Sequence, residues 1–272
     1  LFAKLYHLEE TTTIEISDKK VSICIETPSE LIKKMLSYAV GCMFGRYSLD
    51  CEGVVYAGGT WDDNKFILFK PDEDSIIPIT DEEYLEDDIV SRLCKWLKVV
   101  FGEENLENNL DYIASVLENK GSSSREVIRN YFLSDFFAEH SKMYQKCPIY
   151  WLFDSGKQNG FKALVYSHRY NSNTVGNLRV DYLHRLQRIY ESEINRMQDM
   201  IDNSMNNRET AVSAKRKEKL QKQLKECQAY DEKIGHLALA RVDIDLNDGI
   251  KVNYEKVQIA SDGKKYQVLA KI

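Results

Sequence analysis

The chain has 272 residues, 43% of them hydrophobic, so it is long enough to bury a core in one large domain or two small ones. Its 43 Asp and Glu side chains outnumber 37 Lys and Arg, and the net charge of −6 excludes a uniformly basic nucleic-acid surface. The longest mostly apolar run, Met35–Gly45, is too short to span a bilayer. Six cysteines without a C-x-x-C pair favour reduced thiols in a cytoplasmic protein over disulfides or a zinc site.

The chain starts at Leu1 without a signal peptide, as a piece of a longer protein would. Its charge is unevenly distributed along the sequence. Residues 62–118 carry 16 acidic and 5 basic side chains, whereas residues 142–188 carry 8 basic and 2 acidic ones. This asymmetry predicts one face that approaches phosphates and another that is kept away from them. For the acidic segment, the simpler explanation is that its carboxylates lie on the solvent-facing sides of helices.

The first elements are predicted from alternation and from capping residues. Residues 11–26 alternate around a polar centre, which predicts a β-hairpin. Thr27-Pro-Ser-Glu30 predicts a helix start, because the Thr hydroxyl and the Glu carboxylate can form a capping box. This helix is expected to end near Gly41–Gly45. Arg46, which follows, either faces a partner or pairs with the terminal carbonyls, and the second role is the commoner one for an arginine at a helix end. Phe66–Phe69 is predicted as a short strand.

Three further helices are predicted before the middle of the chain. Thr80-Asp-Glu-Glu83 is expected to start one that runs to about Phe101, and Leu106–Leu117 is the second. Ser123 and Glu126 predict the cap of the third. Its aromatic side chains recur at helical spacing, which favours core packing over a stacking platform for bases.

A β-hairpin is predicted at the centre of the sequence. Two apolar, aromatic runs, Ile149–Phe153 and Phe161–Tyr166, flank a polar turn that contains Gly156 and Gly160. Glycine supplies the positive φ angles of tight turns, and Pro148 suits the first position of a strand because it has no N–H to donate.

The second half is predicted to form a helical hairpin and a β tail. Apolar residues repeat every three or four positions on both sides of the polar link Asp202–Thr210, which predicts two antiparallel, coiled-coil-like helices. The cluster Lys215-Arg-Lys217 lies on the second helix. It either binds phosphates or keeps the hairpin soluble, and the second role is somewhat better supported. Two strands, Ile250–Ile259 and Tyr266–Ile272, are expected after a turn at Asn247-Asp-Gly249, whose surroundings lack the glycine and glutamate of a calcium loop.

The fold class expected from these elements is α+β, predominantly helical, with short β-hairpins and a long antiparallel helical hairpin. Four segments are predicted: an acidic mixed α/β segment (1–141), a β-hairpin region with a basic face (142–176), the helical hairpin (177–241) and a C-terminal β segment that packs back on the core (242–272).

Seven collinear blocks carry a family resemblance. They are VGCMFGRYSLD (40–50), YAGGTWD (56–62), IPITDEEYLEDDIV (77–90), NKGSSSREVIRNYFLSDFF (119–137), PIYWLFDSGKQNGFKALVYSHRY (148–170), TVGNLRVDYLHRLQ (174–187) and YDEKIGHLALARVDIDLNDGIKVNY (230–254). The chain resembles the C-terminal region of the PglX-like adenine-specific DNA methyltransferases of BREX phage-exclusion systems, which are related to fused restriction–modification methylases.

This resemblance implies a parent protein that methylates adenine in double-stranded DNA with S-adenosylmethionine. Such enzymes need a Gly-rich cofactor loop and an Asn/Asp-Pro-Pro-aromatic motif for the flipped base. The four prolines here are never adjacent and no glycines form a G-x-G pattern. We therefore expect no cofactor in this piece and nominate no catalytic, cofactor-binding or metal-binding residue.

The leading hypothesis is a target-recognition and helical module that holds the duplex for the parent's catalytic domain. The candidate DNA-contacting side chains lie in the basic segment and supply amide groups for base edges and positive charge for phosphates. They are Lys157, Gln158, Asn159, Lys162, His168, Arg169, Arg179, Arg185 and Arg188.

The alternative hypothesis is a protein-interaction or structural module. In that case the helical hairpin docks another defence-system subunit, a second copy of the chain or the parent's own N-terminal methyltransferase domain. The acidic segment would suit a basic partner. No membrane partner is expected.

Overall fold

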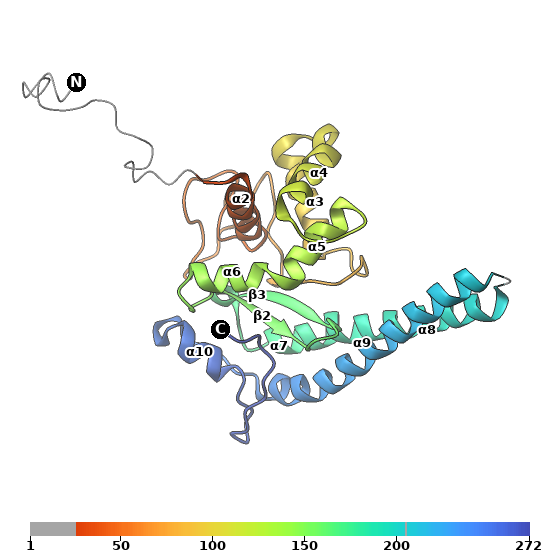
Figure 1. Ribbon diagram of the computed structural model, residues 1–272. Coiled ribbons are helices and arrows are strands. Elements are labelled where there is room, and N and C mark those ends of the chain that lie inside the picture. Colours follow the sequence, from red (N-terminus) through yellow and green to blue (C-terminus); the bar gives the residue numbers. More distant parts are fainter. Residues whose placement is uncertain (1–25, 205) are drawn as a thin grey trace, which may run out of the picture.

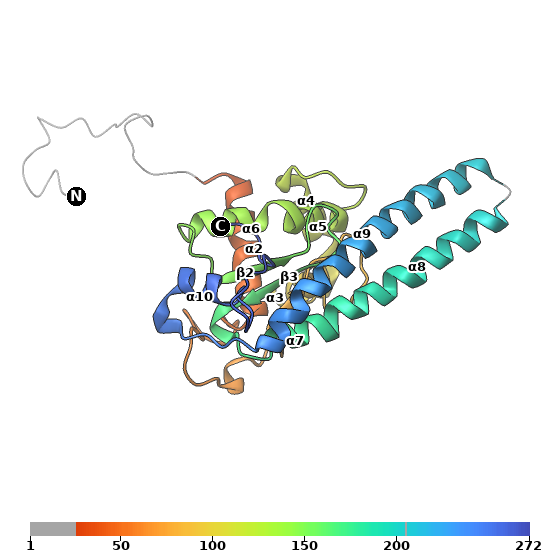
Figure 2. The ribbon, with the colours of Figure 1, turned by 90° about the horizontal axis from the view of Figure 1, so that it is seen from below.

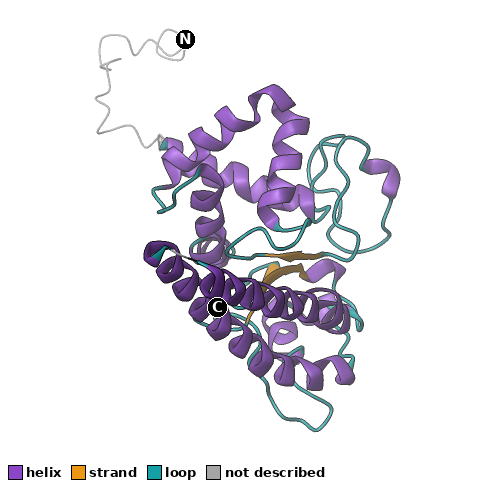
Figure 3. Cartoon of the chain, turned by 90° about the vertical axis from the view of Figure 1, so that its right-hand side faces the viewer, coloured by secondary structure: helices purple, strands orange, loops and turns teal. Residues whose placement is uncertain are grey.

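A three-stranded antiparallel sheet lies between two groups of helices (Figures 1 and 3). The computed structural model describes residues 26–204 and 206–272. One group covers the upper face of the sheet in Figure 1 and comprises α2 (Pro28–Met43), α3 (Ile89–Phe101), α4 (Leu106–Leu117), α5 (Ser124–Ser134) and α6 (Phe136–Met143). The other covers the lower face and comprises α7 (Thr174–Asn177), a π-helical turn (Leu178–Leu183), α8 (His184–Asn203), α9 (Asn207–Ala240) and α10 (Ile250–Lys256). The expected α+β, mostly helical class is confirmed.

The sheet separates two hydrophobic cores. Its strands are β1 (Ile76–Pro78), β2 (Tyr150–Asp154) and β3 (Lys162–Tyr166), in the order β1-β3-β2. Alternate side chains of a strand point to opposite faces. Those that enter the core with α2–α6 are Ile77, Tyr150, Leu152, Leu164 and Tyr166. Those that enter the core with α8–α10 are Ile76, Trp151, Phe153, Ala163 and Val165. The predicted central hairpin is confirmed, and its strands are buried on both faces.

Local capping signals place several helices correctly. The Thr27 hydroxyl accepts a bond from the Glu30 N–H at 3.3 Å, and the Glu30 carboxylate accepts the Thr27 N–H at 2.8 Å. The Ser123 hydroxyl likewise accepts the Glu126 N–H at the start of α5. These bonds satisfy N–H groups that the first turn of a helix leaves free.

The strand predicted at Phe66–Phe69 is wrong. Phe66 and Phe69 are buried, but Ile67 and Leu68 between them are 74% and 59% exposed, which is not the alternation of a strand. The backbone N–H groups of Ile67 and Leu68 donate to the Asp50 carboxylate at 2.8 and 3.1 Å. A side chain therefore takes the place of a neighbouring strand, and the segment is a loop.

The helix start predicted at Thr80 is also wrong, since α3 begins at Ile89. Thr80 is buried, and its hydroxyl donates to the Glu82 carbonyl at 2.5 Å and to the Asp88 carboxylate at 3.3 Å. Asp88 is the N-cap of α3 and accepts the Ser91 N–H at 2.8 Å. The threonine thus fixes the loop before the helix instead of capping it.

The predicted antiparallel helical hairpin is present as α8 and α9. The two helices lie side by side and extend away from the sheet, with the turn between them at the far end (Figures 1 and 2). The turn is shorter than the polar link predicted at 202–210, because α8 continues to Asn203 and α9 starts at Asn207. Coiled-coil packing between them stays a prediction.

The strands predicted in the tail are wrong. Residues 250–256 form α10, in which Asn253 and Tyr254 are buried. The following residues make only isolated β-bridges, Ile259 with Lys265 and Leu269 with Phe153. Two backbone hydrogen bonds hold the tail against β2, from the Asp154 N–H to the Val268 carbonyl at 3.0 Å and from the Ala270 N–H to the Leu152 carbonyl at 2.8 Å. The Tyr254 hydroxyl also donates to the Ala270 carbonyl at 2.5 Å.

Some predictions are left open. The hairpin at 11–26 falls almost entirely outside the described residues, and the four-segment division stays a prediction, although β1 of the first segment pairs with β3 of the second. No helix in the described ranges is both long and apolar enough to cross a membrane.

Candidate nucleic-acid interface

The turn between β2 and β3 is fixed by one carboxylate of α9. Glu226 accepts hydrogen bonds from the Ser155 hydroxyl at 2.8 Å and from the N–H groups of Gln158 and Gly160 at 2.9 and 3.0 Å. Gly156 and Asn159 have φ angles of 141° and 53°, so the chain turns sharply here. A short polar turn at the end of two buried strands is thereby held in a single conformation.

The same turn also contacts α8, so it lies between the two long helices. The Tyr190 hydroxyl of α8 donates to the Gly160 carbonyl at 2.9 Å, and the Gln223 amide of α9 donates to the Asn159 carbonyl at 3.4 Å. The side chains of Lys157 and Gln158 are exposed. The backbone of the tip is therefore rigid, while an ammonium and an amide group remain accessible from solvent.

Arg185 and Arg188 are exposed one turn apart at the start of α8. Within the described ranges, neither has a carboxylate within ion-pair distance. The opposite side of α8 is anchored by Leu186 and Tyr190, both fully buried. This part of α8 also carries Tyr190, which bonds to the hairpin tip from the buried side, so Arg185 and Arg188 project from the solvent-facing side of the same helix.

Lys162 is 9% exposed and has partners inside the fold. Its ammonium group donates to the Leu133 carbonyl at 3.1 Å and lies 3.4 Å from the Asp154 carboxylate. The lysine ties β3 to the end of α5. A DNA contact would require it to leave these partners.

Arg169 is likewise engaged in the fold. Its guanidinium donates to the backbone carbonyls of Asp72 and Glu73 at 2.6 and 2.8 Å, and lies 4.2 Å from the centre of the Trp61 ring. Burial lowers the pKa of the Arg169 guanidinium, and the negative charge of Asp72 partly offsets this effect. The arginine holds the loop before β1 against the segment after β3.

Arg179 makes a two-pronged ion pair with Asp231 of α9, at 2.7 and 3.0 Å. His184 is 2.8 Å from the same carboxylate. The pKa of Asp231 is lowered: burial opposes the shift, and the hydrogen bonds from Arg179 and His184 outweigh it. The pair joins the π-helical turn to α9 and takes up the Arg179 charge.

His168 adds no positive charge at neutral pH. Its ring is half-buried beside β3, and its Nδ1 is 3.2 Å from the Ser167 hydroxyl. Burial and then the charge of Arg46 lower its pKa. A neutral imidazole can donate a hydrogen bond but provides no electrostatic attraction to phosphate.

The basic cluster of α9 faces the acidic segment of the same chain. Arg216 is 2.6 Å from the Glu82 carboxylate, and Lys219 is 2.5 Å from that of Asp81. Lys222 pairs with Glu218 one turn earlier. These pairs neutralise two carboxylates of the acidic segment and leave fewer free cations on α9 to attract a partner.

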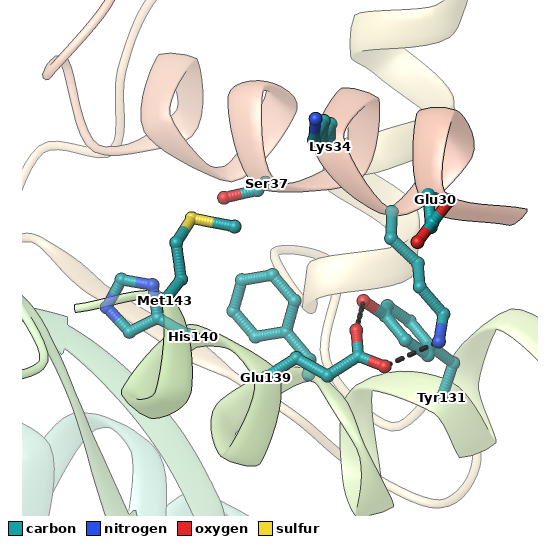
Figure 4. A pocket seen from close by; sticks show the side chains of 9 residues that line it. Glu30, Lys34, Ser37, Tyr131, Glu139, His140 and Met143 are labelled. Carbon is teal, nitrogen blue, oxygen red and sulfur yellow. Dashed lines mark hydrogen bonds and ion pairs between the residues drawn. The ribbon is translucent and has the colours of Figure 1, made fainter. Parts of the chain in front are cut away.

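A pocket of about 250 Å³ lies on the other side of the sheet, between α2, α5 and α6 (Figure 4). Glu139 accepts the Tyr131 hydroxyl at 2.8 Å and the Lys33 ammonium at 2.5 Å, which closes one end of the pocket. His140 lines the opposite end and accepts the Tyr150 N–H at 3.2 Å. The pocket is separate from the candidate DNA-contacting residues. In the described ranges, no three metal-ligating side chains gather in a metal-binding cluster.

The sequence analysis missed Glu226, which organises the hairpin tip. It lies 66 residues from Gly160 in a helix rich in lysine and glutamate, so its pattern is that of any solvated helix face. Nothing local marks it. Only the docking of the tip on α9 shows its role.

Comparisons with known proteins give the chain its relatives. It is 43% identical over 261 residues to the adenine-specific methyltransferase PglX of Lacticaseibacillus casei (strain Zhang), a match that covers 95% of this chain and 22% of that protein. It is 41% identical over 244 residues to the adenine-specific methyltransferase BrxX of Escherichia coli O9:H4 (strain HS), covering 84% and 20%. This chain is homologous to part of the PglX and BrxX proteins. It spans only about a fifth of their length. No protein-family model matches it.

Proposed function

We propose that this chain is a DNA target-recognition module of a longer adenine-specific methyltransferase of the PglX type. The parent would use S-adenosylmethionine and take double-stranded DNA as its substrate, in the cytoplasm and as part of a BREX-type defence system. The homology to PglX and BrxX supports the parent activity, because those relatives are named as adenine-specific methyltransferases. The module itself would carry no catalytic residue, since the sequence contains neither a G-x-G loop nor adjacent prolines.

The observation that carries the DNA-contacting role is the junction of the hairpin tip with α8. Lys157 and Gln158 project from a turn whose backbone is fixed by Glu226. Arg185 and Arg188 are exposed on α8, the helix whose Tyr190 bonds to the tip, and lack a carboxylate partner in the part of the chain that the structure describes. Free cations suit phosphates, and an amide can donate to and accept from a base edge. Lys162, Arg169 and Arg179 would then act by supporting this surface.

The test is a fluorescence-anisotropy titration of the chain with short duplex DNA over a range of salt concentrations. Each lost phosphate contact reduces the slope of log K against log salt by about 0.9. The double variant Arg185→Gln/Arg188→Gln should therefore reduce the slope by up to about 2. The control variant Arg196→Gln/Lys222→Gln removes the same charge from exposed residues that are already paired, with Glu193 and Glu218. Equal slopes in the two double variants would contradict the proposal.

A protein-docking role is the second candidate, and the projecting helical hairpin favours it (Figure 2). Met200 and Val212 are 45% and 63% exposed near its far end. A partner docked on this end of the hairpin would bury both side chains. If the variant Met200→Gln/Val212→Gln lost binding to the parent's catalytic domain while retaining DNA affinity, the docking role would take precedence.

A further inference from the structure

Arg46 is held in a defined position just after α2. Gly45 has a φ of 77°, and the Arg46 N–H donates to the Gly41 carbonyl at 2.9 Å, which closes the helix end. The Arg46 carbonyl accepts the Val55 N–H at 2.8 Å. The next residue, Tyr47, packs its ring over Gly41, where a Cβ would lie 2.3 Å from that ring. The backbone of Arg46 is therefore fixed on both sides.

The guanidinium of Arg46 has no acidic partner. In the described ranges, no carboxylate oxygen lies within 4 Å of it, although Arg92, Arg125, Arg129 and Arg179 each have one. It donates to the phenol oxygens of Tyr47 and Tyr166 at 3.4 and 3.3 Å. These are long bonds, and most of the five N–H donors of a guanidinium remain available. The side chain is only part-buried, so a ligand can reach it.

Among the described residues, the groups beside Arg46 are phenols and imidazole rings, which can donate hydrogen bonds, and no carboxylate lies within 4 Å of it. Tyr47 stacks on Tyr38 with ring centres 5.2 Å apart, and Tyr144 packs beside His140 with ring centres 4.7 Å apart. His140 and His168 lie close enough for the Arg46 charge to lower the pKa of both rings, after the larger effect of burial. A cation beside phenols and neutral imidazoles fits a phosphate, which accepts several hydrogen bonds and neutralises the cation.

We propose that Arg46 and Tyr47 form a phosphate-binding site that holds a backbone phosphate of bound DNA. This site lies on the loop after α2, away from the hairpin tip, and would provide a second point of contact with the duplex. The assignment to DNA rests on the function proposed above. The phosphate chemistry rests on the geometry of Arg46 alone.

The first test compares DNA binding by Arg46→Gln and Arg46→Lys in the same anisotropy titration. Arg46→Gln should reduce the salt slope by about 0.9, the value for one lost phosphate contact, while Arg46→Lys should retain the slope. The effect should add to that of Arg185→Gln/Arg188→Gln, because the two surfaces contact different phosphates. An unchanged slope in Arg46→Gln, with normal binding by the wild type, would overturn the DNA assignment and leave the proposed function intact.

The second test needs no DNA. Inorganic phosphate should raise the Tm of the wild type relative to chloride at the same ionic strength, because it binds only the folded protein. This gain should disappear in Arg46→Gln and shrink in Tyr47→Phe, which removes one hydroxyl and keeps the packed ring. If even the wild type bound no DNA, but the rise in Tm with phosphate depended on Arg46, the proposed function would fail. Free phosphate would then replace DNA as the ligand. The absence of a phosphate gain in the wild type would overturn the site.

Discussion

Glu226 and Gly160 are joined by a 3.0 Å hydrogen bond from the glycine N–H to the glutamate carboxylate, although 66 residues separate them. A Cβ on Gly160 would lie 2.7 Å from the Gln223 carbonyl oxygen and 3.1 Å from the Cys227 sulfur. The hairpin tip therefore approaches α9 so closely that only glycine fits. This contact connects the sheet to the long helices and fixes the turn that carries Lys157 and Gln158.

Replacing Glu226 by glutamine should loosen the tip. A neutral amide oxygen is a weaker acceptor for the Gln158 and Gly160 N–H groups than a carboxylate, and its NH₂ group can accept nothing. We expect a loss of about 1–3 kcal/mol in the free energy of unfolding, with faster amide exchange at these two positions. Urea denaturation and hydrogen exchange measure both effects. Glu232→Gln, at an exposed position of the same helix, is the control and should change neither.

Gly160→Ala should destabilise the protein because its new methyl group meets backbone. We expect a loss of about 1–3 kcal/mol in the free energy of unfolding, the usual cost of overpacking. Gly176→Ala is the matched control, since a Cβ there meets nothing within 4 Å and the residue is helical. That control should be neutral or slightly stabilising by denaturation. Equal losses in both variants would refute the close approach.

Arg129→Met should be strongly destabilising. Asp88 is fully buried, and its carboxylate pairs with Arg129, whose guanidinium also donates to the Thr80 carbonyl at 3.0 Å. Without the arginine, a buried charge is left unpaired, which costs about 3–5 kcal/mol. Arg125→Met breaks an exposed pair with Glu107 and should cost less than about 1 kcal/mol. Denaturation curves that show similar losses for both variants would contradict the buried role of Asp88.

His140 should make stability depend on pH. Burial, and to a lesser degree the charge of Arg46, lower the pKa of this histidine from its ordinary 6.5 to about 3. Between these values the unfolded chain binds a proton that the folded protein does not, so stability is lost as pH falls from about 6.5 towards 3. The variant His140→Gln has no side chain at this position that binds a proton in this pH range. As pH falls from 7 to 4, the free energy of unfolding of the wild type should therefore decrease relative to that of the variant. A constant difference between the two would show that His140 is not held neutral.

Local patterns were enough for elements whose structure is decided by neighbouring residues. The capping box of Thr27 and Glu30 and the cap at Ser123 were predicted because each is completed within a few residues. The long helices α8 and α9 were predicted from their apolar repeats. Thr80 failed as a cap because its hydroxyl is used by Glu82 and Asp88 instead of by a helical N–H.

Tertiary contacts decided the tail and the candidate site. The β-like residues at 250–256 became helical where Tyr254 packs edge-on against Trp151 and bonds to Ala270. The charges of Lys162, Arg169 and Arg179 were predicted to face DNA, but their acceptors lie between 8 and 125 residues away and use those charges inside the fold.

The sequence by itself determined the mostly helical α+β class, the central hairpin and the helical hairpin, together with the resemblance that the homology to PglX and BrxX confirms. The tertiary structure decided which cations are free, because an ion pair or a hydrogen bond depends on residues that are distant in sequence and adjacent only after folding. Arg185, Arg188 and Arg46 remain without carboxylate partners in the described ranges for that reason, while Arg179 and Arg196 pair with Asp231 and Glu193.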